Sequence, residues 1–233
     1  MMVTGIIVAA GKGIRMNRAV RKQYLKLAED PVLCHTLRAM DACLLITRIL
    51  LVIPADDFEY CRRHILSSLS TRNEITLIAG GAERQDSVYN GLLAIPEEDG
   101  IVVIHDGVRP FVDEGIFTQC IETAQTTGAC ISGIPVSDTV KQVTASAVIE
   151  KTLDRETLWL AQTPQVFRYG IIRRAHERAR ETGDRGTDDA LLVERMGHDI
   201  KIIPGSRFNM KITTPEDLRM AEAMVKSEGH GFT

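Results

Sequence analysis

Aromatic residues, paired cysteines and long apolar runs are all scarce in this sequence, and each shortage excludes a class of protein. Aromatic residues make up 5% of the 233 positions, so few side chains are present on which single-stranded nucleic acid could stack. The five cysteines form no Cys-x-x-Cys pair, which predicts reduced thiols in a cytoplasmic protein rather than a disulfide framework or a zinc site. No apolar run approaches the roughly 18 residues of a transmembrane helix, and no basic residue precedes the first apolar run, so we expect neither a membrane span nor a signal peptide.

The net charge is also small. The sequence has 28 Lys and Arg residues against 31 Asp and Glu residues, which leaves −3. A field of that sign does not favour binding to DNA or to an anionic membrane. We therefore expect small molecules as ligands, with neither nucleic acid nor membrane as a partner.

The chain alternates short apolar runs with longer amphipathic segments, which is typical of a doubly wound, mostly parallel α/β sheet. The apolar runs are continuous, as in strands that helices cover on both faces. They predict strands over Thr4–Ala10, Arg48–Ile53, Ile75–Ala79, Ile101–His105, Ala129–Pro135 and Ile200–Ile203. The amphipathic segments predict helices near Pro31–Ala42, Asp56–Leu66, Arg84–Ala94, Asp113–Thr127, Tyr169–Glu181, Asp188–Met196 and Pro215–Lys226. Because no Pro-, Gly- or Ser-rich linker divides the chain, we expect one domain over residues 1–233.

Residues 137–157 depart from this alternation. Two β-rich runs, Thr139–Val143 and Ala147–Leu153, flank a short turn without an intervening helix. This pattern predicts a β-hairpin that projects from the sheet as an arm. A projecting hairpin has unpaired edges that a second subunit can cover, but a hairpin packed on its own domain fits the sequence equally well.

The segment after the first predicted strand reads Ala9-Ala10-Gly11-Lys12-Gly13-Ile14-Arg15-Met16. Ligands of open parallel sheets bind beyond the carboxyl ends of the strands, which is where this segment lies. Gly11 and Gly13 let the backbone approach a ligand closely and offer N–H groups to phosphate oxygens. The segment matches neither a Walker A loop nor a dinucleotide fingerprint, whose third glycine is replaced by Met16. An NAD-dependent dehydrogenase is therefore disfavoured.

Basic residues crowd the same region, with no acid among them between Gly11 and Lys26. They are Lys12, Arg15, Arg18, Arg21, Lys22 and Lys26. In a chain of net −3 this cluster indicates a local site for a polyanion, and the lack of aromatic residues favours a small phosphorylated ligand over nucleic acid. Arg15 and Lys22 flank the glycine loop and are the best candidates for phosphate contacts, whereas we expect the other four on a solvated surface.

Further motifs follow in order along almost the whole chain. After the glycine loop and Lys22-Gln23-Tyr24, they are Gly80–Arg84 with Ser87-Val88, His105–Pro110, Pro135-Val136 with Asp138-Thr139 and Lys141, Asp154-Arg155 with Leu158-Trp159, Gln162–Gln165 with Phe167, Thr187–Ala190, and Asn209–Leu218. In this order they resemble the 2-C-methyl-D-erythritol 4-phosphate cytidylyltransferase family. Gly107, where that family more often has Ala, and Met210, where Ile is usual, are small departures. The ribitol-5-phosphate cytidylyltransferases share much of the pattern, but their first loop usually reads Ala-Gly-Gly rather than Ala9-Ala10-Gly11.

The resemblance implies transfer of CMP from CTP to the polyol phosphate, with release of pyrophosphate. The phosphate of the acceptor attacks the α-phosphorus in line, and because its second pKa is near 6 it is mostly a dianion at neutral pH. The reaction that the resemblance implies therefore needs no general base. It assigns Arg15 and Lys22 to the α-phosphate, and Arg155 and Lys211 to the attacking polyol phosphate. It also implies a homodimer in which the arm supplies Arg155 to the neighbouring site.

The resemblance further implies a set of binding residues. The cytosine is read by main-chain groups and one hydroxyl, from Ala9, Ala10, Gly81, Ala82 and Ser87. Asp106 contacts the substrate or, indirectly, a metal ion. Other substrate contacts come from Arg109, Thr139 and Thr163. We expect Mg²⁺ held mainly by the CTP phosphates, because no carboxylate pair stands out in the sequence.

Several alternatives remain open from sequence alone. The same fold could serve as a nucleotide-binding module without catalysis. Arg155 could form an ion pair with Asp154, and Lys211 could pair with Glu216 or Asp217. Asp106 could cap a helix or pair with Arg109, while the neighbouring His105 is expected to be structural.

Overall fold

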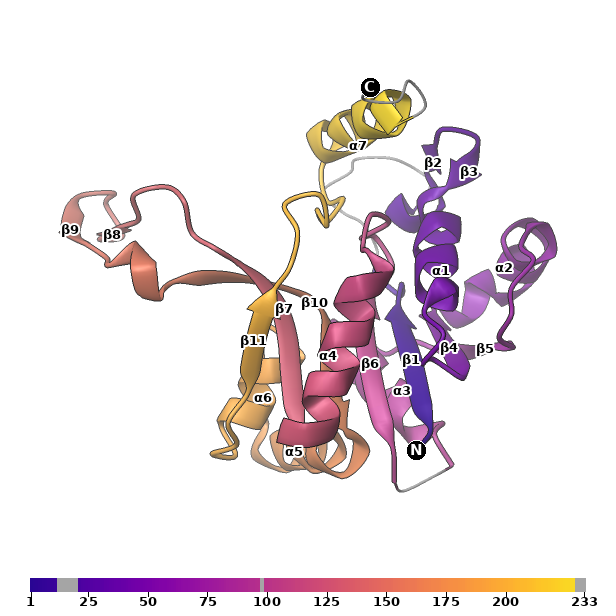
Figure 1. Cartoon of the computed structure of the whole chain (residues 1–233), viewed down its shortest axis with the longest axis horizontal. Helices are drawn as coiled ribbons and strands as arrows, with labels where there is room; N and C mark the ends of the chain where they lie inside the picture. The colour runs from indigo at the N-terminus through magenta and orange to yellow at the C-terminus, as the bar shows by residue number, and fades with distance from the viewer. Residues whose placement is uncertain (12–20, 97–98, 229–233) are drawn as a thin grey trace.

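A seven-stranded sheet forms the centre of the molecule, and helices cover both of its faces (Figure 1). This computed structural model describes residues 1–11, 21–96 and 99–228. The strands, in their order across the sheet, are β11 (Lys201–Pro204), β7 (Ala129–Pro135), β10 (Trp159–Arg168), β6 (Ile101–Asp106), β1 (Val3–Val8), β4 (Arg48–Ile53) and β5 (Ile75–Ala79). The longer helices are α1 (Val32–Ala42), α2 (Phe58–His64), α3 (Arg84–Leu93), α4 (Glu114–Thr127), α5 (Tyr169–Thr182), α6 (Asp189–Glu194) and α7 (Pro215–Glu228).

The predicted α/β architecture is confirmed. Six strands and all seven predicted helices lie within two residues of their expected bounds. β1, β4, β5 and β6 run parallel to one another, and β7 and β11 form a second parallel pair. No helix in the described part of the chain is long and apolar enough to cross a membrane.

The sequence analysis missed β10, which runs antiparallel to both β6 and β7 and makes the sheet mixed. Its apolar pattern is interrupted by Pro164, which cannot donate a ladder hydrogen bond, and by neighbouring polar residues. The pairing of β10 with β7 shifts register between Ala161 and Gln165, so Pro164 lies where the ladder is already irregular. A strand of this kind has no recognisable alternation, because its polar residues are buried for hydrogen bonding rather than exposed to solvent.

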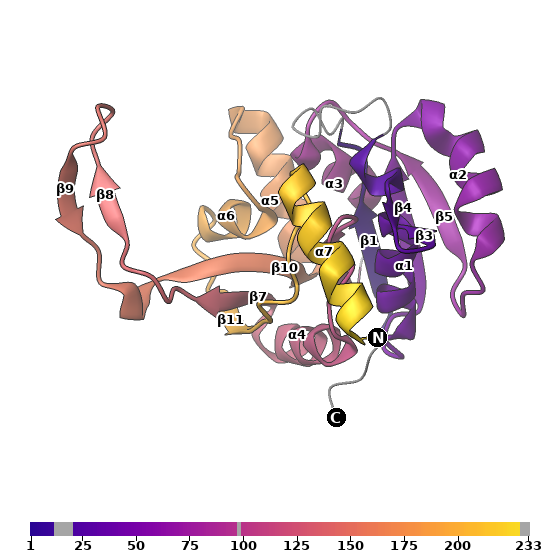
Figure 2. The same ribbon diagram turned by 90° about the horizontal axis from the view of Figure 1, so that it is seen from above.

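The core has two layers, one on each face of the sheet. Side chains of a strand alternate between faces, so on β1 Ile7 packs towards α1 and α4, and Ile6 packs towards α3, α5 and α6. Figure 2 separates these two groups of helices. Every residue of β6 is buried, as predicted for a strand covered on both sides.

Two short strands, β8 (Lys141–Val143) and β9 (Ile149–Thr152), form the predicted arm. They pair only with each other in a separate sheet, and the arm projects well away from the body (Figures 1 and 2). The alternative of a hairpin packed on its own domain is therefore wrong. Both strands are exposed throughout, including Ile149, which is 60% exposed.

The segment between β11 and α7 crosses the carboxyl ends of the central strands. The backbone N–H of Ile212 donates to the carbonyl of Val108 at 2.9 Å, and Ile212 belongs to a small apolar cluster with Leu25 and Leu218. This cluster joins α7 to the segment that follows the glycine loop. It therefore brings the segment that follows Lys211 next to the segment that follows Lys22.

Candidate functional site

The carboxyl ends of β1 and β6 lie side by side and form the floor of the candidate site. Val8 is paired with Asp106, and the N–H of Gly107 donates to the Val8 carbonyl at 2.9 Å. The segment after β1 is fixed by Gln23, whose side-chain amide donates to the Ala9 carbonyl at 2.6 Å. Ala9 therefore lies next to Gly107, which follows Asp106, as expected for residues that follow adjacent parallel strands.

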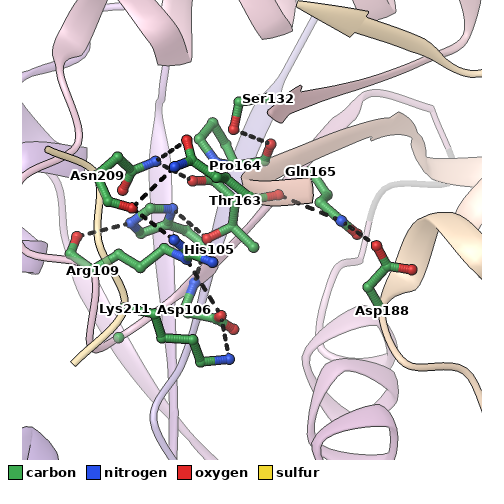
Figure 3. Close-up of polar contacts among 12 residues, drawn as sticks. His105, Asp106, Arg109, Ser132, Thr163, Pro164, Gln165, Asp188, Asn209 and Lys211 are labelled. Atoms are coloured by element: carbon green, nitrogen blue, oxygen red, sulfur yellow. Dashed lines mark hydrogen bonds and ion pairs between the residues drawn. The ribbon is translucent and has the colours of Figure 1, made fainter. Parts of the chain in front are cut away.

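Asp106 is surrounded by cations from three separate segments. Its Oδ2 lies 2.7 Å from Lys211 Nζ and 3.7 Å from Arg109 Nε (Figure 3). Its Oδ1 lies 3.0 Å from Arg84 Nε. Burial alone would raise the pKa of this carboxyl, but Arg84 and Lys211 outweigh that effect and hold the pKa well below its usual range. Asp106 is thus an ionised carboxylate at neutral pH, and its predicted pairing with Arg109 is only one part of a larger cluster.

Lys211 is held at this point by the chain around it. Arg109 Nη1 donates to the Asn209 carbonyl at 2.7 Å, and the Asn209 side-chain amide donates to the Thr163 carbonyl at 2.8 Å. These bonds tie the C-terminal segment to β10 and to the loop after β6. Figure 3 shows the Lys211 ammonium directed at the Asp106 carboxylate.

The alternative partners of Lys211 are engaged elsewhere. Asp217 Oδ2 accepts from the backbone N–H groups of Thr213 and Thr214 at 2.8 and 2.9 Å, which caps the start of α7. Glu216 forms an ion pair with Arg219 at 2.8 Å. The interpretation in which Lys211 pairs with an acid of α7 is therefore wrong.

Thr163 and His105 hold the backbone of Asp106 in place through a chain of hydrogen bonds. The Asp106 N–H donates to Thr163 Oγ1 at 3.1 Å, and Thr163 Oγ1 lies 3.0 Å from His105 Nδ1 (Figure 3). Burial lowers the pKa of His105 to about 4, so its ring is neutral near pH 7. His105 Nε2 lies 3.2 Å from the Arg109 carbonyl, so this nitrogen carries the proton and Nδ1 accepts from the Thr163 hydroxyl. As expected, His105 is structural, and the Thr163 hydroxyl is already engaged inside the protein.

A polar cavity of about 120 Å³ opens at this cluster. Its lining consists mainly of charged and amide-bearing residues, namely Arg84, Asp106, Arg109, Ala161, Gln162, Thr163, Gln165, Thr187, Asp188 and Lys211. Three of the predicted contacts (Asp106, Arg109 and Thr163) and Lys211 therefore share one cavity. The lining carries three positive charges (Arg84, Arg109 and Lys211) and two negative ones (Asp106 and Asp188), and Asp189 adds a third negative charge behind Arg84.

The predicted cytosine-binding loop lies beyond β5, which β1 and β4 separate from β6. A Cβ on Gly80 would stand 2.3 Å from Ala10 Cβ, so only a glycine permits this close approach of the two loops. The N–H of Gly81 donates to Ser87 Oγ at 3.1 Å, and Ser87 Oγ donates to the Glu83 carbonyl at 3.0 Å. The Ser87 hydroxyl therefore has only an acceptor lone pair left for a ligand.

Other predicted residues are placed farther from the cavity or outside the described residues. Arg15 and Gly13 lie outside them. Lys22 begins a short 3₁₀ helix, Lys22–Tyr24, and is partly buried, while Gly11 and Ala82 are exposed. The structure thus brings Ala9, Ala10, Gly81 and Ser87 to the same edge as Asp106 without testing their roles.

The two predicted residues of the arm are not brought to the site of their own chain. Thr139 and Arg155 are both exposed, and Arg155 Nη1 donates to the Ser137 carbonyl at 2.7 Å rather than pairing with Asp154. Neither residue lines the cavity, and the arm strands β8 and β9 project away from the central sheet (Figure 1). The structure of the single chain therefore does not test the predicted role of Arg155.

Of the other basic residues near the loop, Arg21 departs from the expected solvated surface. Its Nε lies 2.9 Å from Asp57 Oδ2, which also accepts from the Tyr24 hydroxyl at 3.1 Å. Lys26 is exposed, as expected. Lys12 and Arg18 lie outside the described residues.

Sequence reasoning assigned no role to Arg84, Asp189 or Gln165, although each contributes to the surroundings of the cavity. Arg84 bridges Asp106 and Asp189, while Gln165 accepts from the Asp189 N–H at 3.1 Å and donates to Asp188 at 2.7 Å. All of them lie in the motifs that carry the resemblance. The signal was therefore present, but a motif alone does not say which of its polar residues meet in space.

Among the described residues, no group of three or more His, Cys, Asp or Glu side chains could hold a metal ion. Asp106 is the acidic group nearest the centre of the cluster, and cations already occupy both of its oxygens. The donor set therefore fits a metal ion bound chiefly through ligand phosphates better than one bound by a protein cage.

Comparison with known proteins gives one consistent result. The model of the 2-C-methyl-D-erythritol 4-phosphate cytidylyltransferase (IspD) family matches residues 3–227. The enzyme of that name from Pelotomaculum thermopropionicum is 47% identical over 97% of this chain and 94% of its own length. The one from Syntrophus aciditrophicus is 48% identical over 97% of each chain.

Solved structures give the same answer for the fold. The 4-diphosphocytidyl-2C-methyl-D-erythritol synthase of Anaerococcus prevotii superposes with a TM-score of 0.86 at 32% identity, covering 97% of this chain and 96% of its own. The 2-C-methyl-D-erythritol 4-phosphate cytidylyltransferase of Thermus thermophilus gives 0.78 at 31% identity, covering 97% of this chain and 100% of its own. These matches confirm the predicted resemblance and do not favour a ribitol phosphate enzyme, a dehydrogenase or a non-catalytic module. The chain therefore belongs to the 2-C-methyl-D-erythritol 4-phosphate cytidylyltransferase family, the nucleotidyltransferases that transfer CMP from CTP to this polyol phosphate.

Proposed function

We propose that the edge formed by β1 and β6 holds CTP and methylerythritol phosphate so that the acceptor phosphate attacks the α-phosphorus in line. The observation that carries this proposal is the pair of cations, Lys211 and Arg109, at the Asp106 carboxylate, beside the loop that begins at Ala9. The reaction brings two anions together, and fixed cations offset their repulsion and stabilise the charge of the transition state.

The two substrates occupy different parts of this edge. Main-chain groups of Ala9, Ala10, Gly81 and Ala82 read the cytosine, and Gly11, Gly13, Arg15 and Lys22 contact the phosphates of CTP. The free lone pair of Ser87 Oγ suits the exocyclic amino group of cytosine, which is a donor. Uracil has an acceptor at that position, so this contact would favour CTP over UTP.

The polyol phosphate lies over the cavity at Asp106. Lys211 and Arg109 attract its phosphate, and the ionised Asp106 accepts hydrogen bonds from its hydroxyl groups. Cations already hold both oxygens of Asp106 at 2.7 and 3.0 Å, which favours this role over direct metal binding. Thr163 supports Asp106 through its hydroxyl and lines the wall beside the substrate.

No side chain needs to remove a proton. The phosphate dianion of the acceptor is already a nucleophile near neutral pH. His105 lies next to Asp106, but both of its ring nitrogens are engaged inside the protein and burial lowers its pKa to about 4. Catalysis is therefore assigned to charge and orientation.

Mg²⁺ accompanies CTP and, when bound, neutralises part of the triphosphate charge. It keeps phosphate oxygens and water as most of its ligands.

The active form is a homodimer in which the arm of one subunit completes the site of the other. Arg155 adds a cation near the polyol phosphate, and Thr139 adds a hydroxyl. Exposed apolar residues of the arm support this proposal, because Val148 and Ile149 are 61% and 60% exposed and suit burial in an interface. We also place the protein in the cytoplasm, since all five cysteines are free and buried.

Pyrophosphate release tests the proposed reaction. With CTP and Mg²⁺, we expect release to depend on 2-C-methyl-D-erythritol 4-phosphate, and to be far slower with ribitol 5-phosphate or with UTP. Release with ribitol phosphate alone would overturn the assignment of the acceptor. CTP binding by calorimetry without any turnover would support a non-catalytic module instead.

A further inference from the structure

Arg84 bridges two buried carboxylates that belong to different parts of the fold. Its Nε lies 3.0 Å from Asp106 Oδ1, and its Nη1 lies 2.7 Å from Asp189 Oδ2. Asp106 ends β6 inside the candidate site, whereas Asp189 begins α6. The two carboxylate side chains are only 7% and 1% exposed. Arg84 therefore connects the site to a point within the packed helical layer.

Asp189 is fixed from several sides and can act as a rigid support. Its Oδ1 lies 3.1 Å from Nε2 of His176, which is fully buried on α5, and its backbone N–H donates to Gln165 at 3.1 Å. Burial would raise the pKa of Asp189, but Arg84 and His176 outweigh that effect and keep the carboxyl ionised. A buried charge of this kind is tolerated only with such partners.

The Asp106 carboxylate is consequently held at both oxygens by groups of different rigidity. Lys211 reaches Oδ2 with a flexible side chain that is 35% exposed. Arg84 reaches Oδ1 with a planar fork whose other arm is anchored on Asp189. Because a guanidinium is more strongly pre-organised than an ammonium, Arg84 sets the plane of the carboxylate and Lys211 can adjust to it.

We propose that Arg84, anchored by Asp189, is a positioning residue that orients the Asp106 carboxylate for the hydroxyl groups of the polyol phosphate. This inference rests on the proposed function, in which Asp106 contacts that substrate. Arg84 acts through Asp106 and does not itself contact the reacting atoms.

The neighbouring cytosine-binding loop does not depend on the Arg84 guanidinium. The Glu83 N–H donates to Asp86 Oδ2 at 3.2 Å, the Glu83 side chain caps the first turn of α3, and Gly81 is bound by Ser87. Main-chain and capping bonds thus hold the loop when the Arg84 side chain is changed. We therefore expect a substitution of Arg84 to lower kcat/KM for the polyol phosphate and to leave the KM for CTP nearly unchanged.

Steady-state pyrophosphate release with each substrate varied in turn tests this inference. The variants are Arg84→Gln, Asp106→Asn, the double variant, and Arg185→Gln as the control. Arg185 pairs with Asp86 at 3.5 Å and is 63% exposed, so its loss removes an arginine near α3 without touching Asp106. We expect Arg84→Gln to lower kcat/KM for the polyol phosphate about 10- to 100-fold, with the KM for CTP changed by less than about threefold. Arg185→Gln should match the wild type.

The double variant separates positioning from other roles. If Arg84 acts through Asp106, the double variant is no worse than Asp106→Asn alone, because the group that Arg84 orients is already lost. Multiplicative losses would overturn the inference and assign Arg84 an independent role. An unchanged kcat/KM in Arg84→Gln would overturn it as well.

A second variant covers the case in which Arg84→Gln fails to fold. Arg84→Lys keeps the positive charge between the two carboxylates but lacks the planar fork. We expect its unfolding temperature to stay near that of the wild type, with kcat/KM for the polyol phosphate lowered about tenfold. Wild-type kinetics in a folded Arg84→Lys protein would contradict the inference.

The same data distinguish failure of the inference from failure of the proposed function. If Asp106→Asn leaves kcat/KM for the polyol phosphate unchanged, Asp106 does not contact that substrate, and both the proposed role and the inference are wrong. If Asp106→Asn lowers it and Arg84→Gln does not, only the inference is wrong.

Discussion

The cavity at Asp106 and the projecting arm differ in burial and in how many contacts hold their side chains within the chain. Asp106 is 5% exposed and is held by cations and hydrogen bonds from β6, β10, α3 and the C-terminal segment. The arm strands are exposed throughout and pair only with each other. One region is pre-organised within a single chain, whereas the other has polar and apolar groups that only another molecule can cover. The position of a cation on the arm therefore does not depend on the contacts that fix the cations in the cavity.

Loss of Lys211 should have the largest effect. Lys211→Ala removes the cation 2.7 Å from Asp106 Oδ2, which is proposed to attract the attacking phosphate. Removal of one such donor typically costs about 2.7–4 kcal/mol, so kcat/KM should fall about 100- to 1000-fold. Lys201→Ala, on the exposed edge strand β11, is the matched control. If the two variants have equal activity, the cavity is not the reaction site.

Loss of Arg155 should have a smaller effect and should not alter folding. Arg155 is exposed and its side chain donates to the Ser137 carbonyl within the same arm, so Arg155→Ala should leave the unfolding temperature unchanged. We expect kcat/KM for the polyol phosphate to fall about 10- to 100-fold, because a rim cation is partly screened by solvent. Lys151→Ala on β9 provides an exposed control on the same arm. Equal kinetics in both variants would exclude the arm from the site.

The association of subunits should depend on the apolar face of the arm. Ile149→Asp places a charge at a side chain that is 60% exposed in the single chain and is proposed to be buried in the dimer. Burial of an isoleucine contributes about 1.5–3 kcal/mol, so we expect at least about a tenfold rise in the dimer dissociation constant. Sedimentation equilibrium measures it. A dimer of unchanged affinity would show that the arm tip lies outside the interface.

The stability of the interior around Asp106 should depend on pH. The pKa of buried His105 is about 4, against an ordinary 6.5, so between these values the unfolded chain binds a proton that the folded chain does not. The free energy of unfolding should therefore decrease as the pH falls from 6.5 towards 4, by at most about 1.4 kcal/mol per pH unit. Asp106 and Asp189 act at lower pH, because their depressed pKa values make a contribution that is present above 3.8 and is lost as the pH falls below it.

Urea unfolding at pH 7, 6 and 5 measures this slope. His105→Gln should flatten it, while His64→Gln, which changes an exposed ring on α2, should leave it unchanged. Equal slopes in wild type and His105→Gln would show that another group is responsible.

Most of the fold was predictable because its strands are apolar and its helices amphipathic. β10 was not, since Gln162, Thr163 and Gln165 are buried for hydrogen bonding and Pro164 interrupts the pattern. Periodicity records which side chains avoid water. It does not record buried polar groups that find partners elsewhere in the chain.

The sequence also predicted part of the site. Motifs located Asp106 and Lys211, which meet at 2.7 Å although they are far apart in sequence. The bridge from Asp106 through Arg84 to Asp189 was missed, because it depends on three segments meeting in space. The roles of Arg15 and Gly13 stay predictions, as these residues lie outside the described part of the chain.

A subunit-mixing experiment tests most directly whether a fixed cavity and a partner's arm form one site. Lys211→Ala and Arg155→Ala proteins are mixed in equal amounts after subunit exchange has been verified with two affinity tags. If the site is shared, half of the dimers are mixed and one of their two sites is intact, so activity returns to about a quarter of the wild-type value. No recovery after proven exchange would contradict the account, because Arg155 would then act within its own chain or not at all.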